Sequence, residues 1–206
     1  MTAMIEERGE DLSAQLIVER AGRDSEYLRA LATLRMTVFR SWPYLYDGSE
    51  AYEARYIAEF LSDPSAALIV ARLGEIPVGM ATASPMASQS EAIRRPFLDL
   101  GLDPDRIFYF GESVLLPQFR GLGIGNRFFA EREAAARSAG ADTATFCAVA
   151  RPAEHPMRPA KARDLTDFWN RRGYRLAPRL TTTMDWKEVG HPAEQPHLMQ
   201  FWIKQL

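Results

Sequence analysis

The stretch Glu112–Asn126, ESVLLPQFRGLGIGN, constrains this chain more than any other. It contains a short apolar run that ends at Pro117, a turn with glycines at alternate positions, and a helical segment that we expect over 126–139. Glycines permit positive φ and the close approach of a ligand, and amides at a helix N-terminus carry partial positive charge without intrahelical partners. This order predicts a phosphate-binding turn, to which Arg120 adds a charge that can grip a phosphate bidentately.

The spacing of the glycines distinguishes this turn from two common phosphate-binding motifs. A P-loop would end in Gly-Lys-Ser or Gly-Lys-Thr, and a dinucleotide fingerprint would have the spacing G-x-G-x-x-G. The chain instead has Gln118, Arg120, Gly121, Gly123 and Gly125. This Q-x-x-G-x-G pattern, with R-G-x-G-x-G overlapping it, resembles the acyl-CoA pyrophosphate loop of the GNAT (GCN5-related N-acetyltransferase) family. An ordinary glycine-rich strand-to-helix turn is the alternative interpretation.

Composition excludes several classes of protein. The chain has 206 residues and a net charge of −2, which argues against general affinity for nucleic acid. No apolar run is long enough to span a bilayer, and the N-terminus lacks the pattern of a signal peptide, so we expect no membrane partner. The single cysteine, Cys147, excludes an internal disulfide framework, so we expect a cytoplasmic protein. Three scattered histidines predict no metal site.

Periodicity predicts the order of the elements. After a polar tail at 1–13, we expect a single domain over 14–206 with the order β–α–α–β–β–β–loop–α–β–α–β–β. This order is similar to the GNAT arrangement, an α/β (α+β) fold with a mixed, splayed, mostly antiparallel sheet of about six to seven strands and helices on both faces. The connection at 85–106 is longer than the minimal family pattern, and we expect a short helix near 96–100 because proline suits a first helical turn.

Two amphipathic helices are expected before residue 62. Asp24 or Ser25 can cap the first, and Ser49 can cap the second. The second helix carries aromatic residues at helical spacing: Tyr52, Tyr56 and Phe60. The segment joining the two helices carries Trp42, Tyr44 and Tyr46. Because this region commonly forms the acceptor site in GNAT proteins, a hydrophobic lid over a substrate and ordinary packing are equal interpretations.

The resemblance implies a reaction and a way of holding the acyl donor. An acetyl group would move from acetyl-CoA, without a metal, to a primary amine of a small molecule or peptide by direct transfer in a ternary complex. The pantetheine arm would lie along Val114, Leu115 and Leu116. The pyrophosphate would meet the amides of Arg120, Gly121, Leu122, Gly123, Ile124, Gly125 and Asn126. These contacts depend on the backbone, so side-chain identity matters mainly at the glycines.

Glu112 is the candidate general base. Many GNAT proteins place a glutamate in the strand that leads to the loop, where it deprotonates the amine directly or through water. A carboxylate flanked by Phe108, Phe110 and Val114 would be partly desolvated, which suits a proton acceptor. The alternative is a structural carboxylate that pairs with an arginine or a backbone amide, and both interpretations stand.

The proton donor is not evident from the sequence. Many GNAT proteins have a tyrosine at the position of Trp169, which has no acidic hydroxyl, so Trp169 is placed with the residues that contact the coenzyme. Tyr174 occupies an aromatic position that usually packs in the core. His155, in a proline-rich loop, is the second catalytic candidate as base, acid or substrate contact, or it is a surface residue. Cys147 fits a small buried residue better than an acyl-carrying thiol.

Two other functions remain open at this point. The missing tyrosine, and the missing asparagine after the fifth strand, favour an acyl-CoA-binding sensor or interaction module with the same fold. A nucleotide-binding protein would use the loop without the pantetheine arm. Exposed aromatic residues and the last strand make a homodimer a further expectation.

Overall fold

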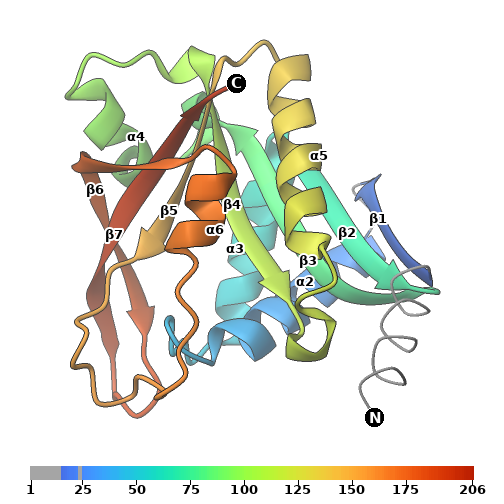
Figure 1. Ribbon diagram of the computed structural model, residues 1–206, viewed down its shortest axis with the longest axis vertical. Helices are drawn as coiled ribbons and strands as arrows, with labels where there is room; N and C mark the ends of the chain where they lie inside the picture. The colour runs from blue at the N-terminus through green and yellow to red at the C-terminus, as the bar shows by residue number, and fades with distance from the viewer. Residues whose placement is uncertain (1–14, 23–24) are drawn as a thin grey trace.

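The computed structural model describes residues 15–22 and 25–206, which form one open sheet with helices on both faces (Figure 1). The strands are β1 (Leu16–Ala21), β2 (Ala67–Leu73), β3 (Ile76–Pro85), β4 (Ile107–Leu115), β5 (Thr143–Val149), β6 (Arg175–Lys187) and β7 (Glu194–Gln205). In this part of the chain the sheet has seven strands in the order β1-β2-β3-β4-β5-β7-β6, and only β4 and β5 pair in parallel. The expected mixed, mostly antiparallel sheet is confirmed. The expected tail at 1–13 and the cap Asp24 lie outside the described residues.

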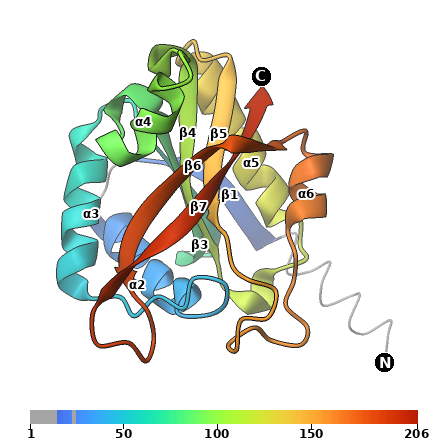
Figure 2. The same cartoon turned by 90° about the vertical axis from the view of Figure 1, so that its left-hand side faces the viewer.

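The helices divide between the two faces of the sheet (Figures 1 and 2). One face is covered by α2 (Ser25–Phe39), α3 (Glu50–Ser62) and α4 (Glu91–Leu98), and the other by α5 (Ile124–Ser138) and α6 (Thr166–Arg171). Ser49 caps α3 as expected, because its hydroxyl accepts a hydrogen bond from the Tyr52 amide at 3.3 Å. None of the helices in the described part of the chain is long and apolar enough to cross a membrane.

The face under α5 and α6 is a packed aromatic core. Phe129 of α5 lies 5.1 Å from Tyr174 and 5.7 Å from Phe146, measured between ring centroids. Trp169 of α6 packs against Phe146 and Trp202 at 5.1 and 4.9 Å. The core packing expected for Tyr174 is confirmed, because this side chain is fully buried.

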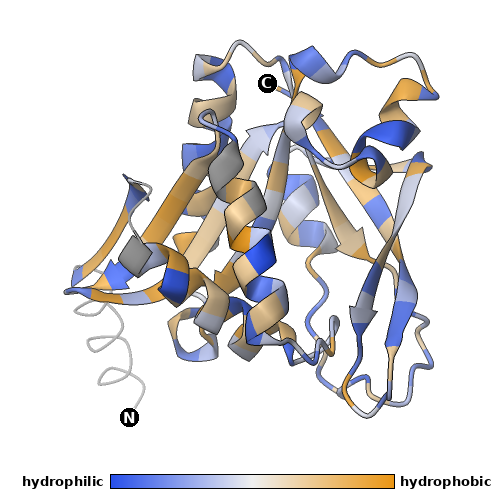
Figure 3. Cartoon of the chain, turned by 180° about the vertical axis from the view of Figure 1, so that it is seen from behind, coloured by the Kyte–Doolittle hydropathy of each residue, from blue (hydrophilic) through white to orange (hydrophobic). Residues whose placement is uncertain are grey.

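The opposite face of the sheet is less uniform in hydropathy (Figure 3). Leucines of α2 pack on the apolar strands β2 and β3, which are drawn in hydrophobic colours, whereas the β6–β7 hairpin is mostly blue and pale. The alternating exposure along β6 agrees with this pattern. The result is a packed end under α2 and, between α3, α4 and the hairpin, a second buried hydrophobic cluster beneath the more polar residues of the hairpin.

Strand β4 separates from β5 halfway along its length. The two strands pair only from Ile107 to Tyr109, opposite Thr143 to Thr145. Beyond this point β5 continues beside β7, while β4 continues beside β3 to Leu115. The sheet is therefore splayed immediately before the glycine-rich turn, as the resemblance implied.

A β-bulge in β4 decides which face Glu112 occupies. Ala83 of β3 pairs with Phe110 and Ala81 pairs with Ser113, so Gly111 and Glu112 together oppose a single residue. The extra residue reverses the alternation of side chains beyond it. Phe108 and Phe110 point into the core under α5, while Glu112 lies on the α3 face. The expectation that these phenylalanines flank Glu112 is therefore wrong.

Glycine is required at the bulge. A Cβ atom at Gly111 would lie 2.5 Å from the hydroxyl oxygen of Thr82, closer than non-bonded atoms approach. The absence of a side chain thus allows the bulge to form against β3.

Two helices begin earlier than the sequence indicated. α4 starts at Glu91, so Pro96 lies inside the helix instead of in its first turn. A proline there cannot bond the carbonyl four residues before it, and Thr182 of β6 donates its hydroxyl to that carbonyl, Ala92 O, at 2.7 Å. α5 starts at Ile124, two residues earlier than expected, because Gly123 adopts φ +79° and caps it.

Candidate active site

The glycine-rich turn presents its backbone to solvent. Gly121 and Gly123 have φ of +88° and +79°, and a Cβ at either would meet no atom within 4 Å. Between and after them, Leu122 and Ile124 turn inward onto the core under α5. The alternating glycines therefore form an open cradle of backbone groups at the start of a 15-residue helix, the arrangement that suits a phosphate.

Arg120 and Trp169 have other contacts in this structure. The Arg120 guanidinium bends back to the Leu115 carbonyl, with both Nε and Nη2 at 3.3 Å from the oxygen. Trp169 is half-buried in the aromatic core beside β5. Val114 is fully buried under α2, so a ligand along β4 would meet its backbone and not its side chain.

A cavity of about 470 Å³ lies on the opposite face, between α3, α4, the splayed strands and the hairpin. We call it the α3 cavity. Its volume is in the range of small-molecule sites. Eight aromatic side chains line it: Phe39, Tyr44, Tyr46, Tyr52, Tyr56, Phe60, Tyr109 and Trp186. The charged lining residues are Arg35, Asp63, Glu112 and Asp185.

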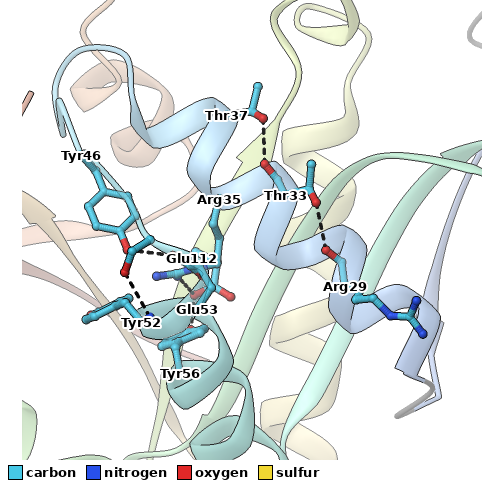
Figure 4. Close-up of polar contacts among 10 residues, drawn as sticks. Arg29, Thr33, Arg35, Thr37, Tyr46, Tyr52, Glu53, Tyr56 and Glu112 are labelled. Atoms are coloured by element: carbon cyan, nitrogen blue, oxygen red, sulfur yellow. Dashed lines mark hydrogen bonds and ion pairs between the residues drawn. The ribbon is translucent and has the colours of Figure 1, made fainter.

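A buried ionic cluster forms one wall of the α3 cavity (Figure 4). Arg35 of α2 donates from Nε to Glu53 Oε2 at 2.7 Å and from Nη1 to Glu112 Oε2 at 2.9 Å. The Tyr46 hydroxyl donates to the other oxygen of Glu53 at 2.9 Å. Tyr56 of α3 donates a short hydrogen bond to Glu112 Oε2. Two helices and strand β4 thus hold the Glu112 carboxylate in one orientation.

The protonation states in the cluster follow from its charges. Burial alone would lower the pKa of Arg35, but Glu112, Tyr56 and Glu53 outweigh it and the pKa is raised. Burial, with Glu112 beside it, raises the pKa of Tyr56 well above its ordinary value. Arg35 is therefore a permanent cation and Tyr56 keeps its proton to donate.

One oxygen of Glu112 is left without a partner. Oε2 accepts from both Arg35 and Tyr56, whereas Oε1 is buried and has no hydrogen-bond partner in the described chain. The Glu112 side chain is only 4% exposed. Because a buried carboxylate oxygen without a partner is costly, this atom is suited to accept a proton or hydrogen bond from a molecule in the cavity.

A tyrosine–cysteine pair lies where β4 and β5 separate. The Tyr109 hydroxyl oxygen is 3.2 Å from Cys147 Sγ, and both side chains line the α3 cavity. Burial raises the pKa of Tyr109 well above its ordinary value and that of Cys147 to about 11. Both groups are protonated at neutral pH, which suits a proton donor and does not favour Cys147 as a nucleophile.

His155 lies outside the residues that line the α3 cavity. Its Nδ1 accepts from the Met157 amide at 3.2 Å, and its Nε2 is 3.8 Å from Glu188. The neighbouring Arg151 bonds the carbonyls of Pro43 and Tyr44 at 2.8 and 2.9 Å, which ties this loop to the α2–α3 connection. The structure thus does not bring the two catalytic candidates together.

Sequence reasoning missed several residues that line the α3 cavity together with Glu112. Arg35 follows Leu31 by four residues and so lies on the buried stripe of α2. An arginine is unusual at such a position, and this is the one sequence signal that could have pointed to it. The sequence places Tyr56 on the aromatic face of the second amphipathic helix, a pattern that indicates packing and not contact with Glu112. No local signal pointed to Tyr109 or Asp63. Among the described residues, no group of three or more potential ligands could hold a metal ion.

Comparison with known structures identifies the fold. A ribosomal-protein-alanine N-acetyltransferase from Brucella melitensis is similar, with 16% identity, a TM-score of 0.61, and coverage of 92% of this chain and 99% of that one. The protein yncA of Salmonella typhimurium, solved with its cofactor acetyl-CoA, has 13% identity, a TM-score of 0.59 and coverage of 93% and 94%. An acetyltransferase from Streptococcus agalactiae has the same identity and TM-score, with coverage of 93% and 99%.

Sequence comparison extends this from fold to family. No curated protein matches the chain significantly. A sequence model of the acetyltransferase (GNAT) family, however, matches residues 31–160, more than half of the chain. The match includes the glycine-rich turn, the splayed strand β4 and the ionic cluster around Glu112. The chain belongs to the GNAT family of acetyltransferases.

Proposed function

We propose that this protein transfers an acetyl group from acetyl-CoA to a primary amine bound in the α3 cavity, by direct transfer in a ternary complex. The observation that carries the proposal is the position of Glu112. Glu112 lines a cavity beside the point where β4 and β5 separate, its buried Oε1 has no partner among the described residues, and the same strand leads directly into the glycine-rich turn. A site for an amine and a cradle for a pyrophosphate are thus joined by one strand.

The glycine-rich turn would hold the donor. The open backbone at Gly121 and Gly123 and the first amides of α5 fit a pyrophosphate, since no side chain fills the cradle. The free edge of β4 beyond Tyr109 offers backbone groups to the pantetheine arm. Acetyl-CoA supplies the thioester carbon that the amine attacks. Arg120 can swing from the Leu115 carbonyl to a phosphate, because it is exposed.

Two side chains would move the protons. Glu112 Oε1 would take a proton from the acceptor ammonium, while Arg35 and Tyr56 hold the other oxygen. Tyr109 carries its proton at neutral pH beside the point of separation and would donate it to the departing sulfur. An ammonium loses two protons in becoming an amide: the first passes through Glu112 to solvent before the attack, and Glu112 takes the second as the amide bond forms and the carbon–sulfur bond breaks. That second proton balances the one that Tyr109 gives to the sulfur.

Calorimetric titration with acetyl-CoA, followed by thiol release with a panel of amines, tests this proposal. Gly123→Glu should weaken acetyl-CoA binding about 100-fold or more, because it places a negative charge in the pyrophosphate cradle. Gly140→Glu is the matched control: it has the same φ of +79° and open surroundings but lies beyond the far end of α5. Equal affinity in both variants would contradict the placement of the donor.

A second candidate is an acyl-CoA-binding sensor with the same fold. It is favoured by the tight pairing of Glu112 with Arg35 and Tyr56, which is also what a purely structural carboxylate would show. Tight binding of acetyl-CoA without thiol release for any amine would favour the sensor. Turnover with any amine would exclude it.

A further inference from the structure

We infer that the acceptor is a small aromatic amine without a carboxylate, an arylalkylamine in chemical terms, and not an amino acid or a peptide N-terminus. This inference rests on the proposed acetyl transfer and specifies its acceptor. It depends on the charge of the α3 cavity, on the carboxylate oxygens there that lack hydrogen-bond partners, and on the aromatic residues that line it.

The α3 cavity has an excess of negative charge. Its charged lining residues are one arginine and three carboxylates. Arg35 is already paired with Glu112 and with Glu53, which lies behind the wall. It therefore has no charge left over for a carboxylate on the ligand. Asp63 and Asp185 are the other two carboxylates of the lining, so a cationic ligand is favoured and an anionic one is repelled.

Two carboxylates of the lining each have a buried oxygen that lacks a partner among the described residues. Asp63 Oδ1 accepts from the Ser65 amide at 2.7 Å, but Oδ2 is buried and unpartnered, as is Glu112 Oε1. Asp63 also follows the last turn of α3, where the helix dipole adds partial negative charge. Both atoms lack a donor that an ammonium group can supply. The unpartnered Glu112 oxygen belongs to a side chain that is almost fully buried.

The aromatic residues that line the cavity favour an amine that carries an aromatic ring. The face of α3 that carries Tyr52, Tyr56 and Phe60 lines one side, and Trp186 of the hairpin lies on the lining as well. Aromatic walls bind a ring by stacking and by edge-to-face contacts, and their faces also stabilise a cation. A volume of about 470 Å³ accommodates one ring with a short amine side chain.

Matched pairs of amines test the inference with the full chain and saturating acetyl-CoA. 2-Phenylethylamine and phenylalanine differ only by a carboxylate, and 2-phenylethylamine and butylamine differ by the ring. We expect kcat/KM for 2-phenylethylamine to exceed that for phenylalanine about 100-fold and that for butylamine about tenfold. A peptide with a free N-terminal alanine is the third comparison.

Asp63→Asn should reduce the preference for 2-phenylethylamine over phenylalanine about tenfold, by removing repulsion from the cavity. Asp105→Asn, which removes the same charge from an exposed position away from the cavity, should leave the preference unchanged. Phe60→Leu should raise KM for 2-phenylethylamine about threefold without changing that for butylamine.

The outcomes separate this inference from the proposed function. Faster turnover of phenylalanine or of the peptide would overturn the inference while acetyl transfer stands. If acetyl-CoA binds but 2-phenylethylamine neither binds in a direct titration nor reacts, the inference is also wrong. Failure of acetyl-CoA to bind would remove the proposed function itself.

Discussion

Two glutamates are buried on opposite faces of the sheet, and they differ in the hydrogen-bond partners of their carboxylate oxygens. Glu133 of α5 receives Lys204, Arg172 and the Tyr174 hydroxyl on one oxygen, at 2.9, 3.1 and 3.2 Å. Glu112 of β4 receives Arg35 and Tyr56 on one oxygen, its second oxygen is buried without a partner in the described part of the chain, and the residue lines a cavity.

The comparison shows that burial and an arginine partner do not by themselves identify a catalytic carboxylate. Glu133 joins α5 to α6 and β7 inside a packed aromatic core, so its charge contributes to the fold. The Glu112 carboxylate is similarly enclosed, but it lines a cavity and, of the two glutamates, only Glu112 is found among the described residues to have a buried oxygen without a partner. Such an acceptor next to a cavity is available to a ligand. Four substitutions test this distinction.

Glu112→Gln should have the largest effect on catalysis. We expect kcat to fall about 100-fold to 10,000-fold, the usual contribution of a general base, with acetyl-CoA affinity unchanged because the glycine-rich turn is untouched. Steady-state kinetics and calorimetric titration measure the two quantities. Full activity across the pH range would make Glu112 a structural carboxylate like Glu133.

Glu133→Gln should show the opposite pattern. Its cationic partners have side chains 20% and 23% exposed and so keep part of their hydration. We therefore expect the free energy of unfolding to fall by about 1–3 kcal/mol, with kcat of the folded protein unchanged. Urea denaturation and activity assays measure this. A large loss of kcat would mean that the two glutamates do not differ in role.

Tyr109→Phe should lower kcat about tenfold if this hydroxyl donates the proton. Because burial raises the pKa of Tyr109 above its ordinary value near 10, the group stays protonated through the neutral range. Its deprotonation would therefore reduce kcat of the native enzyme only above pH 10. A falling limb between pH 7 and 9 that disappears in the variant would contradict this pKa shift, and an unchanged kcat would exclude Tyr109 as the donor.

His155→Gln should have the smallest effect. The side chain lies outside the residues that line the α3 cavity, so we expect kcat/KM to change by less than about twofold. A loss comparable to that of Glu112→Gln would restore His155 as a catalytic residue and would require the loop after β5 to move toward the cavity during the reaction.

Much of the fold could be predicted from local patterns. Strand alternation, the Ser49 cap and the strand–turn–helix unit each depend on neighbouring residues, and the structure confirms them. The start of α4 was placed wrongly because a proline inside a helix is disfavoured by local rules. The bond from Thr182 that compensates for Pro96 comes from a strand 90 residues away.

The candidate site was predictable only in part. Glu112 was selected from its place before the loop, but the bulge at Gly111 that turns it toward α3 depends on pairing with β3. Arg35, Tyr56 and Asp63 come from α2, from α3 and from the residue that ends α3, and no spacing in the sequence shows that they line one cavity. His155 is a candidate because of its place in the proline-rich loop and the chemistry of histidine, and the structure places it outside the residues that line the cavity.

The glycine-rich turn follows from the sequence alone, because positive φ and an open backbone are properties of individual glycines. The order of strands and helices also follows from the sequence, since periodicity is a local property. The carboxylate that has a buried oxygen without a partner, the residues that line the cavity beside it and the charges that remain there all depend on the tertiary structure. Those features arise from packing between elements distant in the chain, where one extra residue in a strand moves a side chain from one face of the sheet to the other.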